Sequence, residues 1–476
     1  MGSVFSDEAP QTKQPSIQPN TTMSKQQQAA GCHLYDSMIA ESDSSSLSAV
    51  LSKRICVAGG HLGEMLIEQG VMVSQATFLK FLESVCKPAT PRVLLETLWT
   101  MCVKRSVSLN DPEVTPLHVF VTLVLSFSLG VDNSSSSSTN EALAPVEIVN
   151  RFVKWMNSKA QKPSSSPSSE ALGSSFDLTS LVLWAQEWGP NTHKVVQSFM
   201  VQTLLPFDKG EGFVAYCPPL LKDGGSTIVK EQDLAPLALY SSLLHGGLRR
   251  LYTSSLDGYS FQHILSALCG YDGPTLVLFK AKLPKSAPEE AKHAKGAVVF
   301  GALATERWRE DPRFFGSSST ILFALSPDFK ILRGGSGAES NYQWLNTRAS
   351  NRKTHGLAFG GSSDFRNHRI FLPSSMDFCV ATGVCGTFEA GALVPSYAQR
   401  AEGAGVFDID TIEVWAVGGD RAIEDAIKAR GLTRELKADA LQKARKCDKA
   451  AFFGNAFDAE NFLGKTMAHR AEQENR

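Results

Sequence analysis

The strongest constraint on the fold of this chain is a series of short apolar segments after Tyr240, divided by Gly, Ser and Pro. Such segments, rich in β-branched and aromatic side chains with turn residues between them, are typical of β-strands. Several are apolar on both faces, so both faces must be covered. The sequence therefore predicts a two-sheet, mainly antiparallel β-sandwich with helices on its outer surface. The predicted strands are Thr275–Lys280, Ala297–Leu303, Thr320–Leu325, Phe329–Arg333, Arg369–Leu372 and Ile412–Val417.

A short helix is predicted just before the first of these strands. Ser260 is placed to cap it, and Gly270 follows where a left-handed residue would end it. Its apolar residues recur at helical spacing and predict a face that packs on the sheet. These residues are Phe261, Ile264, Leu265 and Leu268.

The preceding part of the chain, from Leu47 to Leu205, has a helical pattern instead. Apolar residues recur three and four positions apart, as in Phe78, Leu82 and Val85. Two Ser-rich segments, Asn133–Asn140 and Lys162–Ser169, interrupt the pattern and are predicted to be flexible connectors. No EF-hand calcium loop occurs, so any relation to EF-hands predicts a calcium-silent scaffold.

The predicted fold class is α+β, with four regions along the chain. Residues 1–46 form a disordered tail, because they hold too few apolar side chains to offset the entropy of ordering. Residues 47–240 form a helical region, residues 241–419 form the sheet domain, and residues 420–476 form a helical extension. No membrane span is predicted, since the most apolar segment, Val114–Leu129, contains Pro116 and His118.

The first six residues, Met1-Gly2-Ser3-Val4-Phe5-Ser6, match the pattern for N-myristoylation of Gly2. The alternative is a chance match, because the pattern fixes few positions. A single myristoyl chain gives only marginal, reversible attachment, so stable attachment to a membrane surface needs a second contact.

Charge and cysteine usage exclude several classes of protein. The chain has 47 Lys and Arg against 48 Asp and Glu, which excludes a generally basic nucleic-acid coat protein. Its nine cysteines are scattered and include no C-x-x-C pair, which argues against a disulfide framework or a zinc site. A reducing cytosol is the natural compartment for such a chain.

The C-terminal extension concentrates positive charge. Between Lys428 and Lys449 lie eight basic and three acidic residues, a net charge of +5. Five apolar residues follow it: Phe452, Phe453, Phe457, Phe462 and Leu463. One interpretation is a solvated helix followed by a docking segment. The other is a detachable arm whose aromatic side chains bind a partner, with the basic face meeting acidic protein or anionic lipid.

The segment from Leu251 to Gly418 resembles a TLDc domain, the module of the oxidation-resistance proteins. Its landmarks follow one another in the order of that family. They are Leu251-Tyr252-Thr253-Ser254, Asp257-Gly258-Tyr259-Ser260-Phe261, Gly273-Pro274-Thr275-Leu276-Val277-Leu278, Val299-Phe300-Gly301-Ala302, Trp308-Arg309, Phe314-Phe315-Gly316, Leu322-Phe323-Ala324-Leu325-Ser326-Pro327, Gly356-Leu357-Ala358-Phe359-Gly360-Gly361 and Ile412-Glu413-Val414-Trp415-Ala416-Val417-Gly418. The overall layout is most similar to the myristoylated, lysosome-associated, MTOR-linked TLDc subfamily. Between Gly361 and Phe407 the chain departs from the family pattern, so a ligand surface built there is expected to differ.

The resemblance implies a non-catalytic regulator that binds subunits of the vacuolar-type proton-pumping ATPase. It also implies a contribution to oxidative-stress resistance or to nutrient and MTOR-type signalling, with signalling-kinase complexes as further partners. The implied location is cytoplasmic, attached peripherally to a lysosomal or vacuolar membrane. The partner-binding residues that it suggests are Ser254, Asp257, Gly258, Glu306, Trp308, Arg309, Gly360, Gly361, Glu413 and Trp415.

Each of these residues also has a structural interpretation. Asp257-Gly258 suits a tight turn, and Gly360-Gly361 allows positive φ where the chain reverses. Glu413 is able to pair with a neighbouring strand or a buried arginine, and Trp415 suits a core anchor.

The sequence contains no G-x-S-x-G, P-loop or H-E-x-x-H motif. We therefore expect no enzyme activity, no cofactor, no metal and no nucleic-acid partner. The alternatives are a thiol-dependent antioxidant enzyme that uses Cys379 or Cys385, and a purely structural membrane-tethered scaffold. Cys379 lies in a predicted strand, where a buried cysteine usually acts as a small apolar side chain.

Overall fold

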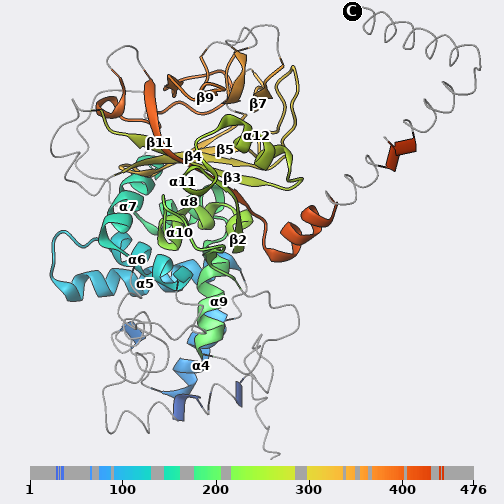
Figure 1. The fold of residues 1–476 in the computed structure, drawn as a ribbon. Coiled ribbons are helices and arrows are strands. Elements are labelled where there is room, and N and C mark those ends of the chain that lie inside the picture. The colour runs from blue at the N-terminus through green and yellow to red at the C-terminus, as the bar shows by residue number, and fades with distance from the viewer. Residues whose placement is uncertain are drawn as a thin grey trace, which may run out of the picture. The chain divides into compact units, whose positions relative to one another are not determined.

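The computed structural model describes most of the chain as two compact units, one of Met1–Val146 with Lys162–Tyr216 and one of Glu147–Gln161 with Cys217–Arg476. Figure 1 shows the fold. The described residues are 74–86, 90–129, 144–160, 176–204, 216–284, 297–335, 339–348, 354–362, 367–400 and 405–429, with a few positions before 67 and after 438. Gly2, most of the predicted tail and most of the basic C-terminal segment lie outside them.

The first unit is helical, as predicted. Its helices are α4 (Gln75–Cys86), α5 (Pro91–Leu109), α6 (Pro116–Leu129), α8 (Leu178–Glu187) and α9 (Thr192–Leu204). Helix α5 begins where the Thr90 hydroxyl accepts a hydrogen bond from the Val93 amide and ends at Asn110, whose φ is 49°. Helix α6 is buried over most of its length, and its Phe127 stacks on Phe199 of α9 with ring centroids 4.0 Å apart. Two apolar helices packed in this way form the centre of the unit.

The described residues of the second unit contain eleven strands. They are β1 (Pro219–Leu221), β2 (Gly246–Thr253), β3 (Thr275–Lys282), β4 (Val298–Ala304), β5 (Ile321–Ser326), β6 (Lys330–Arg333), β7 (Gln343–Asn346), β8 (Gly356–Phe359), β9 (Ile370–Pro373), β10 (Cys379–Val380) and β11 (Val406–Ala416). Their order is β6-β5-β4-β3-β11-β10-β9-β8-β7, with β2 also paired to β11 and β1 to β2. All these pairs are antiparallel except β1 with β2. The α+β class and all six predicted strands are confirmed.

Strand β11 joins the two halves of the sheet. Its first residues, Val406 and Phe407, pair with β10, and the rest of the strand pairs with β3 and β2. One core cluster contains side chains from both halves, including Phe300 and Leu322 from one and Leu357 and Ile370 from the other. The predicted sandwich is thus one continuous hydrogen-bonded path whose two halves pack on a shared core.

Helices α7 (Val146–Ala160), α10 (Glu231–Tyr240), α11 (Ser254–Asp257) and α12 (Phe261–Cys269) belong to the second unit, as does a helix over 420–429. The boundary that we predicted at 240/241 would have left α7 and α10 in the helical region. Helix α12 is the predicted short helix, and Phe261, Ile264 and Leu268 enter the sandwich core.

The ends of α12 differ from the prediction. Ser260 makes no side-chain cap hydrogen bond, and Gly270 is right-handed with φ −82°. The last turn closes through the Gly270 amide, which donates to the Leu268 carbonyl, so no left-handed residue is needed there.

Candidate interaction surface of the sheet unit

Glu413 and Trp415 lie at the centre of the sheet unit, where β11 runs between β2 and β3. Both side chains are fully buried. Glu413 Oε1 accepts hydrogen bonds from the Thr227 amide and hydroxyl, each at 2.8 Å. Its Oε2 accepts from the Ser226 hydroxyl at 2.5 Å and from Trp415 Nε1 at 3.0 Å. Four donors compensate the buried carboxylate, which therefore anchors the 226–227 loop to β11.

Ser254, Asp257 and Gly258 lie beside this centre. The Ser254 hydroxyl accepts from the Ile412 amide at 3.1 Å, and the Asp257 carboxylate accepts from the Thr253 amide at 2.8 Å. Gly258 has φ 84° and ends α11, as expected for a turn glycine. These residues fix the junction of β2, α11 and β11.

The residues after β4 form a second group. Trp308 is buried and donates from Nε1 to the Thr275 hydroxyl at 2.8 Å. Its ring meets Phe359 edge-on at 5.5 Å, which connects this segment to the end of β8. Arg309 is exposed, lies 4.7 Å above the Phe315 ring and donates to Asp311 at 3.1 Å. Glu306 is half-buried in the same segment.

Gly360 and Gly361 follow β8 with positive φ values of 66° and 125°, as predicted. A Cβ at Gly360 would lie 3.0 Å from both Arg369 Cγ and Cys385 Sγ, and one at Gly361 would collide with His368 Nδ1. Both glycines therefore serve a close approach between β8 and β9. In this conformation the predicted partner-binding positions support the fold, and their role in partner binding stays a prediction.

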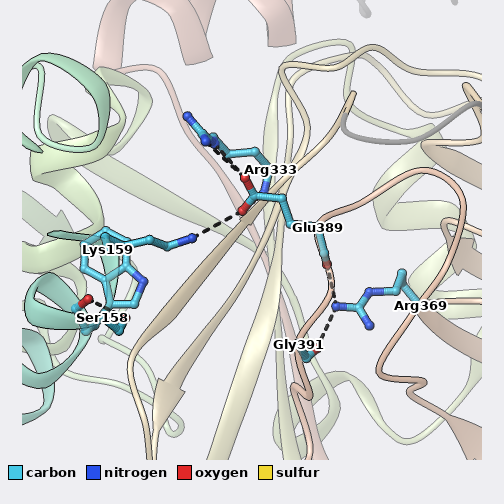
Figure 2. Close-up of polar contacts among 7 residues, drawn as sticks. Ser158, Lys159, Arg333, Arg369, Glu389 and Gly391 are labelled. Carbon is cyan, nitrogen blue, oxygen red and sulfur yellow. Dashed lines mark hydrogen bonds and ion pairs between the residues drawn. The ribbon is translucent and has the colours of Figure 1, made fainter. Parts of the chain in front are cut away.

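Arg369 is fully buried in the sheet unit, and no sequence pattern predicts its role. Its Nη1 donates to the Thr382 carbonyl at 2.5 Å, and its Nη2 donates to the carbonyls of Glu389 and Gly391 at 2.9 and 2.6 Å. Figure 2 shows the contacts with Glu389 and Gly391. All three acceptors lie in the segment between β10 and β11, so one guanidinium holds a long connection against the sheet.

The Glu389 side chain points away from Arg369 into a second polar group. Arg333 of β6 donates from Nε and Nη2 to Glu389 Oε1 at 3.1 and 3.0 Å. Lys159 of α7 approaches Glu389 Oε2 at 3.5 Å, as Figure 2 shows. The carboxylate thus joins β6, the β10–β11 connection and α7.

Three large apolar side chains are exposed on α11, in the turn after it and just before β10. Leu256, Tyr259 and Phe378 are 71%, 49% and 58% exposed, and we call them the Phe378 surface. The Tyr259 hydroxyl reaches the Ile409 carbonyl at 3.5 Å. Burial raises the pKa of Tyr259, and the nearby Cys379 and Asp377 raise it further.

The backbone beneath the Phe378 surface is strained. Met376 and Phe378 have φ values of 62° and 53°, a left-handed conformation that bulky side chains rarely adopt. Arg400 lies 4.8 Å above the Phe378 ring and donates to Asp408 at 3.0 Å. Strain of this kind collects at binding sites, where the surrounding structure holds a side chain in place.

The two candidate cysteines differ in environment. Cys379 is fully buried, and burial raises its pKa to about 12, so its thiol stays protonated at neutral pH. Cys385 is half-buried, and its Sγ accepts from the Phe388 amide at 3.3 Å. Cys379 is therefore unsuited to thiolate chemistry in the folded protein.

Within the described ranges, no group of three or more His, Cys, Asp or Glu side chains could hold a metal ion. None of the helices described is long and apolar enough to cross a bilayer.

Comparison with known proteins agrees with the residue pattern. The family model described as TLDc domain matches residues 223–418. The chain is 30% identical over 173 residues to the MTOR-associated protein MEAK7 of Xenopus laevis, an alignment that covers 36% of this chain and 32% of that protein. It is 26% identical over 272 residues to Restriction of telomere capping protein 5 of Neurospora crassa, covering 48% of this chain and 45% of that protein.

These alignments span less than half the length of the relatives they match. The second part of the sheet unit begins at Cys217. The family match begins six residues later and ends just after β11. It includes every landmark from Leu251 to Gly418. Residues 223–418 of this chain therefore match the TLDc domain family.

Proposed function

We propose that this chain is a non-catalytic regulator that binds the vacuolar-type proton-pumping ATPase through the exterior of its TLDc domain. The observation that carries the proposal is the Phe378 surface, which lies on that domain. Its three apolar side chains are exposed, and Phe378 is held on a strained backbone, whereas Trp308, Glu413 and Trp415 are buried. Apolar and aromatic side chains held rigidly at a surface are typical centres of protein interfaces.

The TLDc domain supports a regulatory role, and the MTOR-associated relative supports a connection to MTOR-type signalling. We propose further that signalling-kinase complexes are partners and that the chain contributes to oxidative-stress resistance. The lysosomal or vacuolar membrane is the proposed location, with Gly2 acylation as the tether.

The ATPase proposal predicts that the Phe378→Asp variant loses co-sedimentation with purified vacuolar-type ATPase. Binding should weaken at least tenfold, because a charge would replace an apolar contact at the centre of the interface. Aspartate tolerates left-handed φ better than phenylalanine, so the variant should fold. Leu183→Asp is the matched control, since Leu183 is 53% exposed on α8 of the helical unit.

Wild-type protein and Leu183→Asp should bind equally and change ATP hydrolysis by the pump equally. Absence of wild-type binding at micromolar concentration would defeat the proposal. Equal binding by Phe378→Asp would show that the ATPase contacts another surface of the chain.

The tether predicts that Gly2→Ala abolishes flotation with liposomes after expression together with an N-myristoyltransferase. Alanine at this position blocks acylation and leaves the rest of the sequence unchanged. Ser3→Ala, which leaves the acceptor glycine in place, serves as the control. Equal flotation of Gly2→Ala and the unchanged protein would exclude acylation as the anchor.

A further inference from the structure

Helix α7 is part of the sheet unit although it lies outside the TLDc match in sequence. It stands between the two Ser-rich segments, Asn133–Asn140 and Lys162–Ser169. Residues Glu147–Gln161 nevertheless group with Cys217–Arg476, and Figure 1 shows α7 below the strands. The TLDc domain therefore carries a helix supplied from a distant part of its own chain.

Aromatic side chains form the centre of the α7 contact. Phe152 and Trp155 both meet the ring of Phe329 edge-on, with centroids 5.2 and 5.1 Å away. They also stack on each other at 5.5 Å. Phe329 is buried and lies immediately before β6. Edge-to-face packing of this kind is directional, so it fixes the rotation of the helix as well as its position.

Three basic side chains of α7 contact polar groups around Phe329. Arg151 Nη1 donates to the Leu325 carbonyl at 2.6 Å, and Lys154 Nζ donates to Asp328 at 2.9 Å. The hydrogen bond from Lys154 is the main reason that the pKa of Asp328 is lowered. Five residues further along the helix, Lys159 reaches Glu389 at 3.5 Å, as Figure 2 shows. We call Leu325, Asp328, Phe329 and Glu389 the α7 receptor.

The sandwich does not depend on α7 for its main core. None of the side chains in the core cluster that joins the two halves of the sheet comes from α7. Lys154 and Asp328 are both exposed, so water readily competes for their ion pair. Helix α7 thus packs outside the core cluster that joins the two halves of the sheet.

We propose that the α7 receptor is a binding surface for an amphipathic helix and that α7 is its intramolecular occupant. A partner helix displaces α7 from this surface. That helix carries two aromatic residues three positions apart, with basic residues beside them. Such a partner would present the pattern of Phe152 and Trp155 to Phe329 and basic charges to Asp328 and Glu389. Because α7 is tethered, its effective concentration is high, and the partner succeeds only when its own affinity or concentration exceeds that of α7.

The test uses the full chain and a fluorescent synthetic peptide of residues 144–160, acetylated and amidated at its ends. In wild-type protein α7 occupies the receptor, so the peptide should bind weakly. The Phe152→Ala/Trp155→Ala chain should bind it at least tenfold more tightly. The Lys154→Glu/Lys159→Glu chain weakens the contact through charge alone, so it should also show tighter binding even if the aromatic variant fails to fold.

Charge exchange tests the geometry. The Lys154→Glu peptide should bind the aromatic variant at least tenfold more weakly than the natural peptide, and adding Asp328→Lys to that chain should restore its binding. Equal peptide affinity in wild-type and both weakened chains would overturn the proposal. The proposal would also be overturned if sedimentation showed that wild-type protein is a dimer and that the Phe152→Ala/Trp155→Ala variant is a monomer. A second copy of the chain would then be the occupant.

Discussion

Replacing Glu413 with glutamine is expected to lower the free energy of unfolding of the sheet unit by about 3 kcal/mol. The amide keeps the size of the side chain but offers a single oxygen to four donors. Its NH2 group would face two N–H or O–H donors that no longer have an acceptor. Leaving buried donors unsatisfied is among the few changes that destabilise a protein strongly.

The Glu413→Gln experiment is a urea titration read by pulsed hydrogen exchange in peptides from β3 and β11. This readout separates the sheet unit from the helical unit, which is necessary because a chain of two units need not unfold in one step. Glu424→Gln, in an exposed position of the 420–429 helix, makes the same chemical change and should shift the midpoint little. Equal midpoints for the two variants would show that the hydrogen bonds of Glu413 do not stabilise the sheet.

The second large effect is expected for Arg369→Met, which should cost about 3 to 5 kcal/mol. Methionine fills much of the same space but cannot donate to the carbonyls of Thr382, Glu389 and Gly391. Arg369→Lys should recover only part of the loss, because one ammonium cannot reproduce the fork that reaches all three acceptors.

Hydrogen exchange should accelerate first between Thr382 and Gly391 in the Arg369 variants, by about a hundredfold for each 3 kcal/mol of local stability lost. Arg313→Met is the control, since Arg313 is exposed. If the amides between Thr382 and Gly391 of the Arg369→Met variant keep protection factors within threefold of wild type, the role assigned to this guanidinium is contradicted.

The sequence predicts the fold well where the signal is periodic. Long apolar runs such as Thr275–Lys280 identify their strands, because they must be buried whatever their neighbours are. Strands β1, β7 and β8 have three, four and four residues and were missed, since so few residues carry no readable period. Their strand conformation comes from pairing with neighbours distant in the sequence, which no local pattern reports.

The candidate site was less predictable than the fold. Glu413 was expected to pair with a strand neighbour or a buried arginine, but its partners other than Trp415 belong to a loop about 187 residues earlier in the chain. The described hydrogen bonds of Arg369 all go to backbone carbonyls. Every residue has a carbonyl, so the sequence does not indicate which ones are its acceptors. Phe378 has a left-handed φ, and nothing in the local sequence predicts that conformation for a phenylalanine. The local sequence therefore identified the landmark residues but not the groups that their side chains contact.

The position of β11 in the sheet has a consequence for synthesis of the protein. The strand that unites the two halves is the last of the eleven to leave the ribosome. Until it emerges, β3 and β10 each have an unpaired edge that can join a neighbouring nascent chain. A truncation or a ribosomal stall between Val380 and Val406 should therefore yield a polypeptide that aggregates or engages chaperones, even though ten of its strands have already been made.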